Sequence, residues 1–196
     1  IVRAQYSSFH QLYEEGIKTD VHPAGLQVLL YGWIKIAGDS PIAVRFPFAL
    51  CGVLSVLFIF LVGRYWFNSL TALSAAAAMA ALQFPLLYSQ VTRMYSIGML
   101  FCLVNVWLWS KILFPRTDSG MKQIMYYMFY VLTALAAMYL HYFSLVFIGT
   151  VGTTGFVYLK RKKILAYVIS WIAIVLLYLP AIPLFFDQLK LGGLQD

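Results

Sequence analysis

The sequence predicts an all-α, polytopic helical membrane protein with about six transmembrane helices and two short interfacial helices on the outer face. Two compositional observations support this fold class: 62% of the 196 residues are hydrophobic, and only 11% are charged. A soluble domain of this length needs far more polar surface to cover itself. The charged residues also fall into short gaps between long apolar runs, which is typical of membrane spans separated by loops.

The charges in these gaps divide unevenly between the two sides that alternating spans define. One side holds eight basic residues against a single acid, Asp118, and therefore carries the whole formal charge of +7. Its basic residues are Arg64, Lys111, Arg116, Lys122, Lys160, Arg161, Lys162 and Lys163. The other side is balanced: Arg3, Lys18, Lys35, Arg45, Arg93 and Lys190 against Glu14, Glu15, Asp20, Asp39, Asp187 and Asp196. Because cytoplasmic loops are enriched in Lys and Arg, we expect the balanced side to face away from the cytoplasm.

Residues 1–41 are predicted to form an extracytoplasmic loop with two amphipathic helices. Ser8 and Gln11 form a capping box that opens the first helix, and Gly16 weakens or ends it. The second covers residues 23–37, with Pro23 at its first helical position. At about 22 Å it is too short to span upright, and its apolar and polar residues line different faces, which is typical of an interfacial helix. In the alternative, residues 23–37 cross the membrane, and Asp20 and His22 then lie on the basic side.

Residues 42–187 are predicted to form the transmembrane bundle, and residues 188–196 to begin a further extracytoplasmic segment. A span needs roughly 20 apolar residues, and six runs come close: 42–63, 70–88, 94–114, 124–141, 144–159 and 164–186. Pro180 and Pro183 should kink or end the last run near the outer surface. Both cysteines, Cys51 and Cys102, lie inside apolar runs and are interpreted as small hydrophobic residues, so neither a disulfide nor a metal site is predicted.

Arg93 is the charged residue whose position is most costly, because it joins two apolar runs without an intervening Gly or Pro. In one interpretation it extends to the outer headgroups. In the other it binds a phosphate, whose oxygens match the guanidinium fork, with Gln90 and Tyr95 as further hydrogen-bond partners. The basic residues are dispersed over separate loops, so nucleic-acid binding is not expected.

Two further polar groups fall on the same predicted side as Arg93. His141 and Tyr142 occupy a tight turn between two spans, as a membrane-surface anchor or as a cleft-facing hydrogen-bond donor or proton carrier. Asp20 and His22 precede the interfacial helix, where they either cap it or help to hold an anion near its positive end. Together these residues predict an extracytoplasmic cleft for an anionic, lipid-bearing ligand.

Five short motifs in this order resemble a known family. They are DVHPAGL at 20–26, WIKIAGDS at 33–40, RFP at 45–47, SQVTRMY at 89–95 and HYF at 141–143. Together they resemble the polyprenyl-phosphate-sugar-dependent glycosyltransferases of the GT-C superfamily, specifically bacterial relatives of dolichyl-phosphate-mannose protein mannosyltransferases. The resemblance covers nearly the whole chain. It implies a multi-pass, inverting enzyme of the bacterial inner or plasma membrane, with its site facing away from the cytoplasm.

The resemblance also implies roles for individual residues. His22 would lie near the donor phosphate, Arg93 matches the arginine of the family's Arg-Met-Tyr motif, and His141 and Tyr142 match its His-Tyr turn. The implied partners are a polyprenyl-phosphate-linked sugar, membrane lipids and an acceptor that is a protein, lipid or glycan. No cofactor or metal is implied.

This sequence departs from the family pattern at three places. Ala24 replaces the second proline of His-Pro-Pro, and Val91 stands where the family often has Glu. The family's catalytic acid is expected before Ile1, in the part of a longer enzyme that this fragment lacks, so the fragment alone is expected to be inactive. Asp20 is the nearest acid and is therefore a candidate catalytic residue. The alternatives are a non-catalytic lipid-binding or transport module and a structural scaffold.

Overall fold

The computed structural model describes residues 5–116 and 120–192, and every regular element within these ranges is helical. The elements are α1 (Phe9–Gln11), the π-helix η2 (Leu12–Ile17), α2 (Gly25–Ala37), α3 (Pro41–Trp66), α4 (Ser69–Ala81), α5 (Gln83–Ser89), α6 (Met94–Leu113), α7 (Gly120–Leu140), α8 (Tyr142–Tyr158), α9 (Arg161–Tyr178), the 3-10 turn η3 (Leu179–Ala181) and α10 (Ile182–Leu191). The all-α prediction is confirmed for the described residues. Arg3, Asp118 and Asp196, which enter the charge balance, lie outside these ranges.

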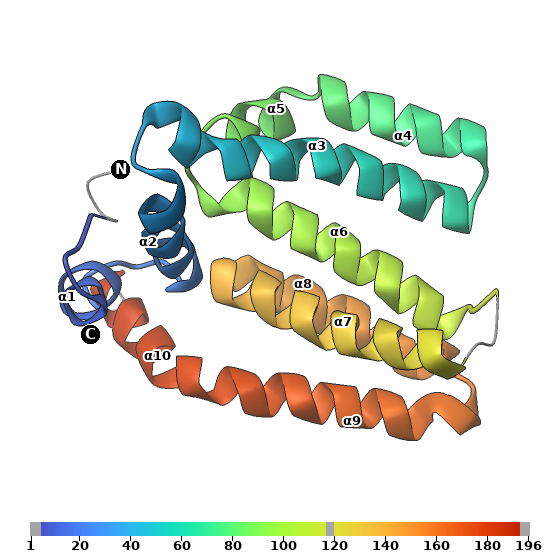
Figure 1. The fold of residues 1–196 in the computed structure, drawn as a ribbon. Coiled ribbons are helices and arrows are strands. Elements are labelled where there is room, and N and C mark those ends of the chain that lie inside the picture. The colour runs from blue at the N-terminus through green and yellow to red at the C-terminus, as the bar shows by residue number, and fades with distance from the viewer. Residues whose placement is uncertain (1–4, 117–119, 193–196) are drawn as a thin grey trace.

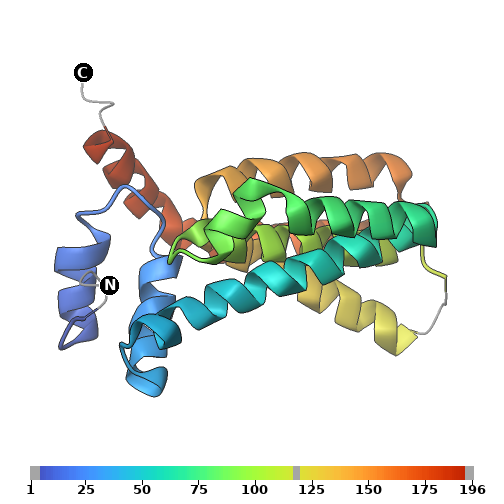
Figure 2. The ribbon, with the colours of Figure 1, turned by 90° about the horizontal axis from the view of Figure 1, so that it is seen from above.

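The long helices run alongside one another, and α1, α2 and α10 gather at one end of the bundle (Figure 1). In the view from above, α2 again crosses the end of the bundle rather than running with it (Figure 2). The last turns of α3, α6 and α8 and the first turns of α4, α7 and α9 lie at the opposite end. We call these the α2 end and the basic end. The predicted alternation of the gaps is thus reproduced by the fold.

The helices support four or five membrane spans rather than the full set of six. Four helical runs are long and apolar enough to cross alone: α3, α6, α7 and the run Arg161–Leu191, which contains α9, η3 and α10. Helices α4 and α5 qualify only as a pair bent by 61°. Helix α8 has 17 residues and is shorter than each of the four runs that qualify alone. The count of six therefore stays a prediction.

The expected single helix over residues 70–88 is broken, and Pro85 accounts for the break. A proline ring clashes with the carbonyl four residues earlier, here that of Ala81, and provides no N–H for a helical hydrogen bond. Helix α4 accordingly ends at Ala81, Leu82 is extended, and α5 starts at Gln83. The effect expected of Pro180 and Pro183 is confirmed, because α9 ends at Tyr178 and gives way to η3.

The N-terminal helices follow the sequence prediction with two corrections. Ser8 caps α1, accepting a hydrogen bond from the Gln11 backbone N–H at 3.1 Å. The helical stretch does not end at Gly16 but continues to Ile17 as a π-helix. Pro23 is not in the first turn of α2, which begins at Gly25, because the turn made by the Asp20 carboxylate occupies the preceding backbone. The interfacial position of both helices stays a prediction.

Helix α2 is fixed to the bundle by an apolar cluster at the α2 end. Leu30 packs with Val44 and Phe48 of α3, Ile97 of α6 and Leu140 of α7. The helix ends at Gly38, whose φ of +80° is a conformation that glycine adopts without strain. These contacts hold the segment before α2, which carries Asp20 and His22, against the ends of the long helices.

Gly25 of α2 lies against the backbone of α7, so Gly25→Ala is expected to weaken the docking of α2. A Cβ atom at this position would lie 2.4 Å from the backbone oxygen of Tyr139. Relieving such an overlap requires backbone movement and typically costs about 1–3 kcal/mol. Gly32→Ala is the matched control, because a Cβ there meets nothing within 4 Å. Thermal unfolding in detergent should show a lower midpoint for Gly25→Ala alone, and equal midpoints would contradict this packing.

Candidate active site

The fold brings all the predicted site residues to the α2 end of the bundle. Asp20 and His22 lie between η2 and α2, Arg93 is the N-cap of α6, and His141 is the single residue between α7 and α8. Tyr95 and Tyr142 lie in the first turns of α6 and α8. In Figure 1 the starts of α6 and α8 and the end of α7 adjoin α2. Residues separated by more than 100 positions are thus placed at one surface.

Asp20 and His22 form a directly bonded pair. The Nδ1 atom of His22 lies 2.7 Å from Oδ1 of Asp20, and the backbone N–H groups of Val21 and His22 donate to the same oxygen at 2.8 and 3.3 Å. The amide of Gln27 on α2 donates to Oδ2 at 2.7 Å. The carboxylate is 11% exposed and the imidazole 35%. Asp20 thus fixes the ring of His22, so that Nε2 points away from the carboxylate.

The electrostatics of Asp20 follow from these partners. Burial alone would raise the pKa of the carboxyl, but the hydrogen bond and charge of His22, with the bonds from Gln27 and Val21, outweigh burial and lower the pKa below its ordinary value. Asp20 is therefore ionised at neutral pH and is a weak proton acceptor. Capping of α2 is not its role, since no side-chain cap is present at that helix start.

His141 serves as the N-cap of α8, a role that the sequence analysis did not consider. Its Nδ1 accepts a hydrogen bond from the Phe143 backbone N–H at 3.1 Å. Burial and the charge of His22 lower the pKa of His141, which favours the neutral ring. Because Nδ1 is an acceptor, the neutral imidazole carries its proton on Nε2. His141 is thus a neutral hydrogen-bond donor close enough to His22 to sense its charge.

Tyr95 connects the segment of Arg93 to His141 through a row of aromatic rings. The Tyr95 ring centroid lies 5.4 Å from that of His141 and 4.4 Å from that of Tyr88 on α5. Phe84 and Phe143 extend the row at its two ends and are both exposed. Such spacings are typical of favourable aromatic contacts. The row fixes the start of α6, and with it the backbone of Arg93, relative to the turn at His141.

Arg93 itself is exposed at the start of α6. Its backbone is extended, and its N–H donates to the Val91 carbonyl at 2.9 Å. Within residues 5–116 and 120–192, no ion pair or side-chain hydrogen bond is recorded for the guanidinium. Next to it, the hydroxyl of Ser96 is buried and lacks a partner among the described residues. The structure therefore leaves donors available at this helix start.

Tyr142 is committed to a structural contact. Its hydroxyl donates to Oε1 of Gln188 on α10, and Nε2 of Gln188 donates to the carbonyl of Ile17 at 3.0 Å. Gln188 is 2% exposed. Tyr142 also lines a cleft of about 120 Å³ under the start of α2, together with Pro23, Ala24, Tyr139, Tyr178, Pro180, Ala181 and Leu184. A single hollow that contains His22, Arg93 and His141 together stays a prediction.

Three buried polar residues of this region were not predicted from the sequence as site residues: Gln27, Ser96 and Gln188. Gln27 is one of the polar residues of the second helix, yet it is buried against Asp20, and its Oε1 lacks a partner among the described residues. The sequence signal that could have revealed this role is the spacing of seven residues between Gln27 and Asp20. At that spacing a side-chain amide can donate a hydrogen bond to the carboxylate. Ser96 and Gln188 carry no comparable signal in the sequence.

Comparison with known families gives one match. The family described as dolichyl-phosphate-mannose-protein mannosyltransferase matches residues 21–186. The matched region begins within the Asp20–His22 turn, includes Arg93 and His141, and ends inside α10. Neither the curated proteins nor the solved structures gave a match.

Proposed function

Because the chain belongs to the dolichyl-phosphate-mannose-protein mannosyltransferase family, we propose that it transfers a sugar from a polyprenyl-phosphate donor to an acceptor at the α2 end. Family membership makes it a membrane glycosyltransferase of the GT-C type. The observation that carries the proposal is the gathering of the Asp20–His22 pair, His141 and the exposed Arg93 at one end of the bundle. These groups are the kind that bind a phosphate diester and stabilise its departure.

The proposed phosphate ligands come from three elements. Arg93 presents a guanidinium at the start of α6, where unpaired backbone N–H groups also favour an anion. His141 donates from Nε2, and His22, whose ring is held by Asp20 through Nδ1, adds a second imidazole directed away from that carboxylate. Tyr95 fixes the position of Arg93 relative to His141 through its ring contact with His141. The proposed role of Tyr142 is to fix α8 and α10 beneath the substrate.

The proposed reaction needs no covalent intermediate. An acceptor hydroxyl loses its proton to a carboxylate, and its oxygen bonds to the anomeric carbon of the donor sugar. The bond between that carbon and the phosphate oxygen breaks, and the electron pair leaves with the polyprenyl phosphate. The phosphate gains negative charge as it leaves, so Arg93, His22 and His141 stabilise the transition state more than the bound donor. Asp20 is assigned the positioning of His22, because its hydrogen bonds make it a poor base.

The proposed orientation places the α2 end away from the cytoplasm. The described residues of the predicted basic side lie at the basic end of the bundle. They belong to the connections after α3, α6 and α8 and to the helix ends beside these connections. An excess of Lys and Arg favours retention of loops on the cytoplasmic side. The lipid chain of the donor would then enter from the outer leaflet.

The proposal is tested with the full-length protein in membranes supplied with radiolabelled sugar on a polyprenyl phosphate. The expected result is enzyme-dependent loss of label from the lipid, with release of polyprenyl phosphate, while a nucleotide-linked form of the same sugar is not consumed. Consumption of the nucleotide sugar alone would contradict the donor class. Saturable binding of the lipid donor without any release would instead establish a non-catalytic lipid-binding module.

A further inference from the structure

The basic end of the bundle carries a second set of groups that the proposed transfer does not use. Two adjoining clefts open there, and Phe114 lines both. The first, of about 490 Å³, is lined mainly by aromatic side chains: Tyr65, Trp66, Trp109, Phe114 and Tyr158, with Thr154. The second, of about 570 Å³, is lined by Leu113, Phe114, Pro115, Lys160, Arg161, Lys162 and Lys163. An apolar hollow thus continues into a strongly cationic one.

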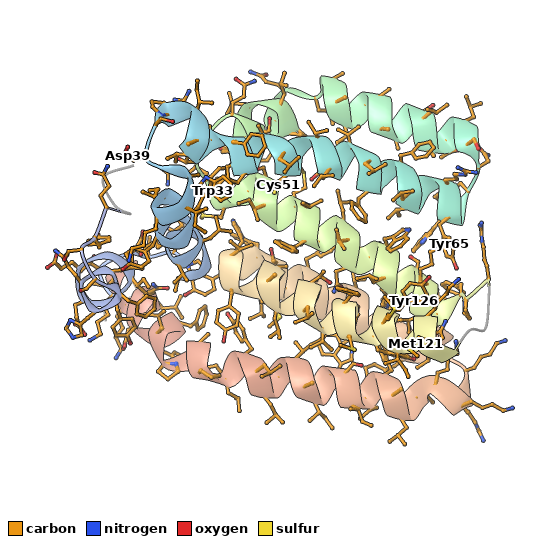
Figure 3. All side chains as sticks on the ribbon, in the orientation of Figure 1. Trp33, Asp39, Cys51, Tyr65, Met121 and Tyr126 are labelled. Carbon is orange, nitrogen blue, oxygen red and sulfur yellow. The ribbon has the colours of Figure 1, made fainter. Side chains whose placement is uncertain are left out.

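The aromatic cleft is built from the ends of three helices. Ring centroids lie 5.8 Å apart between Trp66 and Trp109, 6.3 Å between Trp109 and Phe114, and 6.0 Å between Phe114 and Tyr158. Trp66, Phe114 and Tyr158 are all exposed. Figure 3 shows Tyr65 at this end, in the last turn of α3 and far from Trp33 at the α2 end. The cleft therefore opens on the outside of the bundle.

The cationic cleft lies at the start of α9, where the charges have an unusual sign. Lys160 is the N-cap, without a side-chain cap bond, and Arg161, Lys162 and Lys163 form the first turn, which contains no acid. Cations are unfavourable at a helix N-terminus, whose unpaired N–H groups already carry partial positive charge. Membrane topology accounts for the number of cations on this side but not for their place in this turn. An anion bound at this turn would reverse the unfavourable electrostatics.

A buried and unpaired donor lies in the adjoining aromatic cleft. Trp109 is 4% exposed and lines the aromatic cleft, and its indole N–H has no hydrogen-bond acceptor among the described residues. Its neighbour differs, since the Trp66 indole donates to the Ser110 hydroxyl at 2.7 Å. A buried donor without a partner is costly in the absence of a ligand. A molecule with oxygen acceptors and an apolar chain would satisfy this unpaired N–H and the first-turn N–H groups of α9, of which that of Lys163 already donates to the Lys160 carbonyl.

We propose that the basic end binds one anionic phospholipid. Its phosphate contacts the first turn of α9 and the side chains of residues 160–163, and the upper part of an acyl chain lies in the aromatic cleft. Charge complementarity selects this occupant, because no acid lines either cleft among residues 5–116 and 120–192, and residues 160–163 are all cationic. Basic pockets between spanning helices recognise such headgroups by the same chemistry.

The test compares lipids added to the purified, delipidated chain in detergent. Phosphatidylglycerol should raise the thermal unfolding midpoint in a saturable way, whereas phosphatidylcholine with the same acyl chains should not. Glycerol phosphate, which has the charge without the chains, should have no effect. Phosphatidylglycerol with brominated acyl chains should also quench tryptophan fluorescence, and Trp66→Phe should reduce that quenching.

Two charge-matched double variants separate a defined site from diffuse attraction. Arg161→Gln with Lys162→Gln removes two cleft cations, and each such cation near an anionic lipid contributes roughly fivefold, so affinity should fall about thirtyfold. Arg64→Gln with Lys122→Gln removes two exposed cations of the same end that line neither cleft, and affinity should change only a few-fold. Equal losses in both variants, equal stabilisation by phosphatidylcholine, or full stabilisation by glycerol phosphate would overturn the proposal.

Discussion

Arg93→Ala in the full-length protein is expected to lower the rate of sugar transfer by about a hundredfold to a thousandfold at saturating donor. This is the usual effect of removing one donor that stabilises charge in the transition state. The side chain is exposed and makes no hydrogen bond or ion pair with the described residues, so its loss should leave folding and membrane insertion intact. The measurement is the initial rate of polyprenyl phosphate release, normalised to the amount of protein in the membrane.

The matched control is Arg45→Ala. Arg45 is an exposed arginine in the first turns of α3, at the same end of the bundle. If general electrostatic attraction of the anionic donor were responsible, both variants would lose activity to a similar degree. Arg93→Lys should retain part of the activity, because lysine keeps the charge but not the two-pronged geometry. Normal turnover in Arg93→Ala would remove Arg93 from the phosphate site.

The positions of the helices could be predicted from the sequence because hydrophobicity and charge act locally. A run of apolar residues must be helical in a membrane, since its backbone has no other hydrogen-bond partners there. The predicted run 94–114 accordingly corresponds to Met94–Leu113, and 42–63 to Pro41–Trp66. The same reasoning placed Arg93 and His141 at one end, because the parity of the spans fixes the end on which each connection lies.

The sequence did not determine the bonds between side chains at that end. The contact of Gln188 with Ile17 joins residues 171 positions apart and depends on how α10 returns over η2. His141 was interpreted as an anchor or a cleft donor, but its cap on α8 is set by backbone geometry at the turn. Likewise, Pro85 breaks the helix into α4 and α5, a local effect that the hydrophobic run concealed. Packing decides such details after the spans are in place.

Two substitutions and their combination decide between two roles for Asp20. It either acts through His22 or is itself the proton acceptor. His22→Ala should lower the transfer rate by about a hundredfold, since a charge-assisted donor to the phosphate is lost. Asp20→Ala should cost about tenfold, and the double variant should be no worse than His22→Ala, because groups that act as a unit are not additive. Asp39→Ala, which removes an exposed acid of the same end, is the control.

The stability of a further variant, Asp20→Asn, gives an independent readout that depends on pH. Folding lowers the pKa of Asp20, so its ionised form stabilises the fold above the unfolded-state pKa of about 4, and this stabilisation is lost as the pH falls through the lower, folded-state value. The gap in unfolding free energy between the wild type and Asp20→Asn should therefore be full at neutral pH and close in acid. Asparagine keeps one oxygen for His22, so Asp20→Asn should transfer faster than Asp20→Ala. A far larger loss of transfer in Asp20→Ala than in His22→Ala would instead make Asp20 the base.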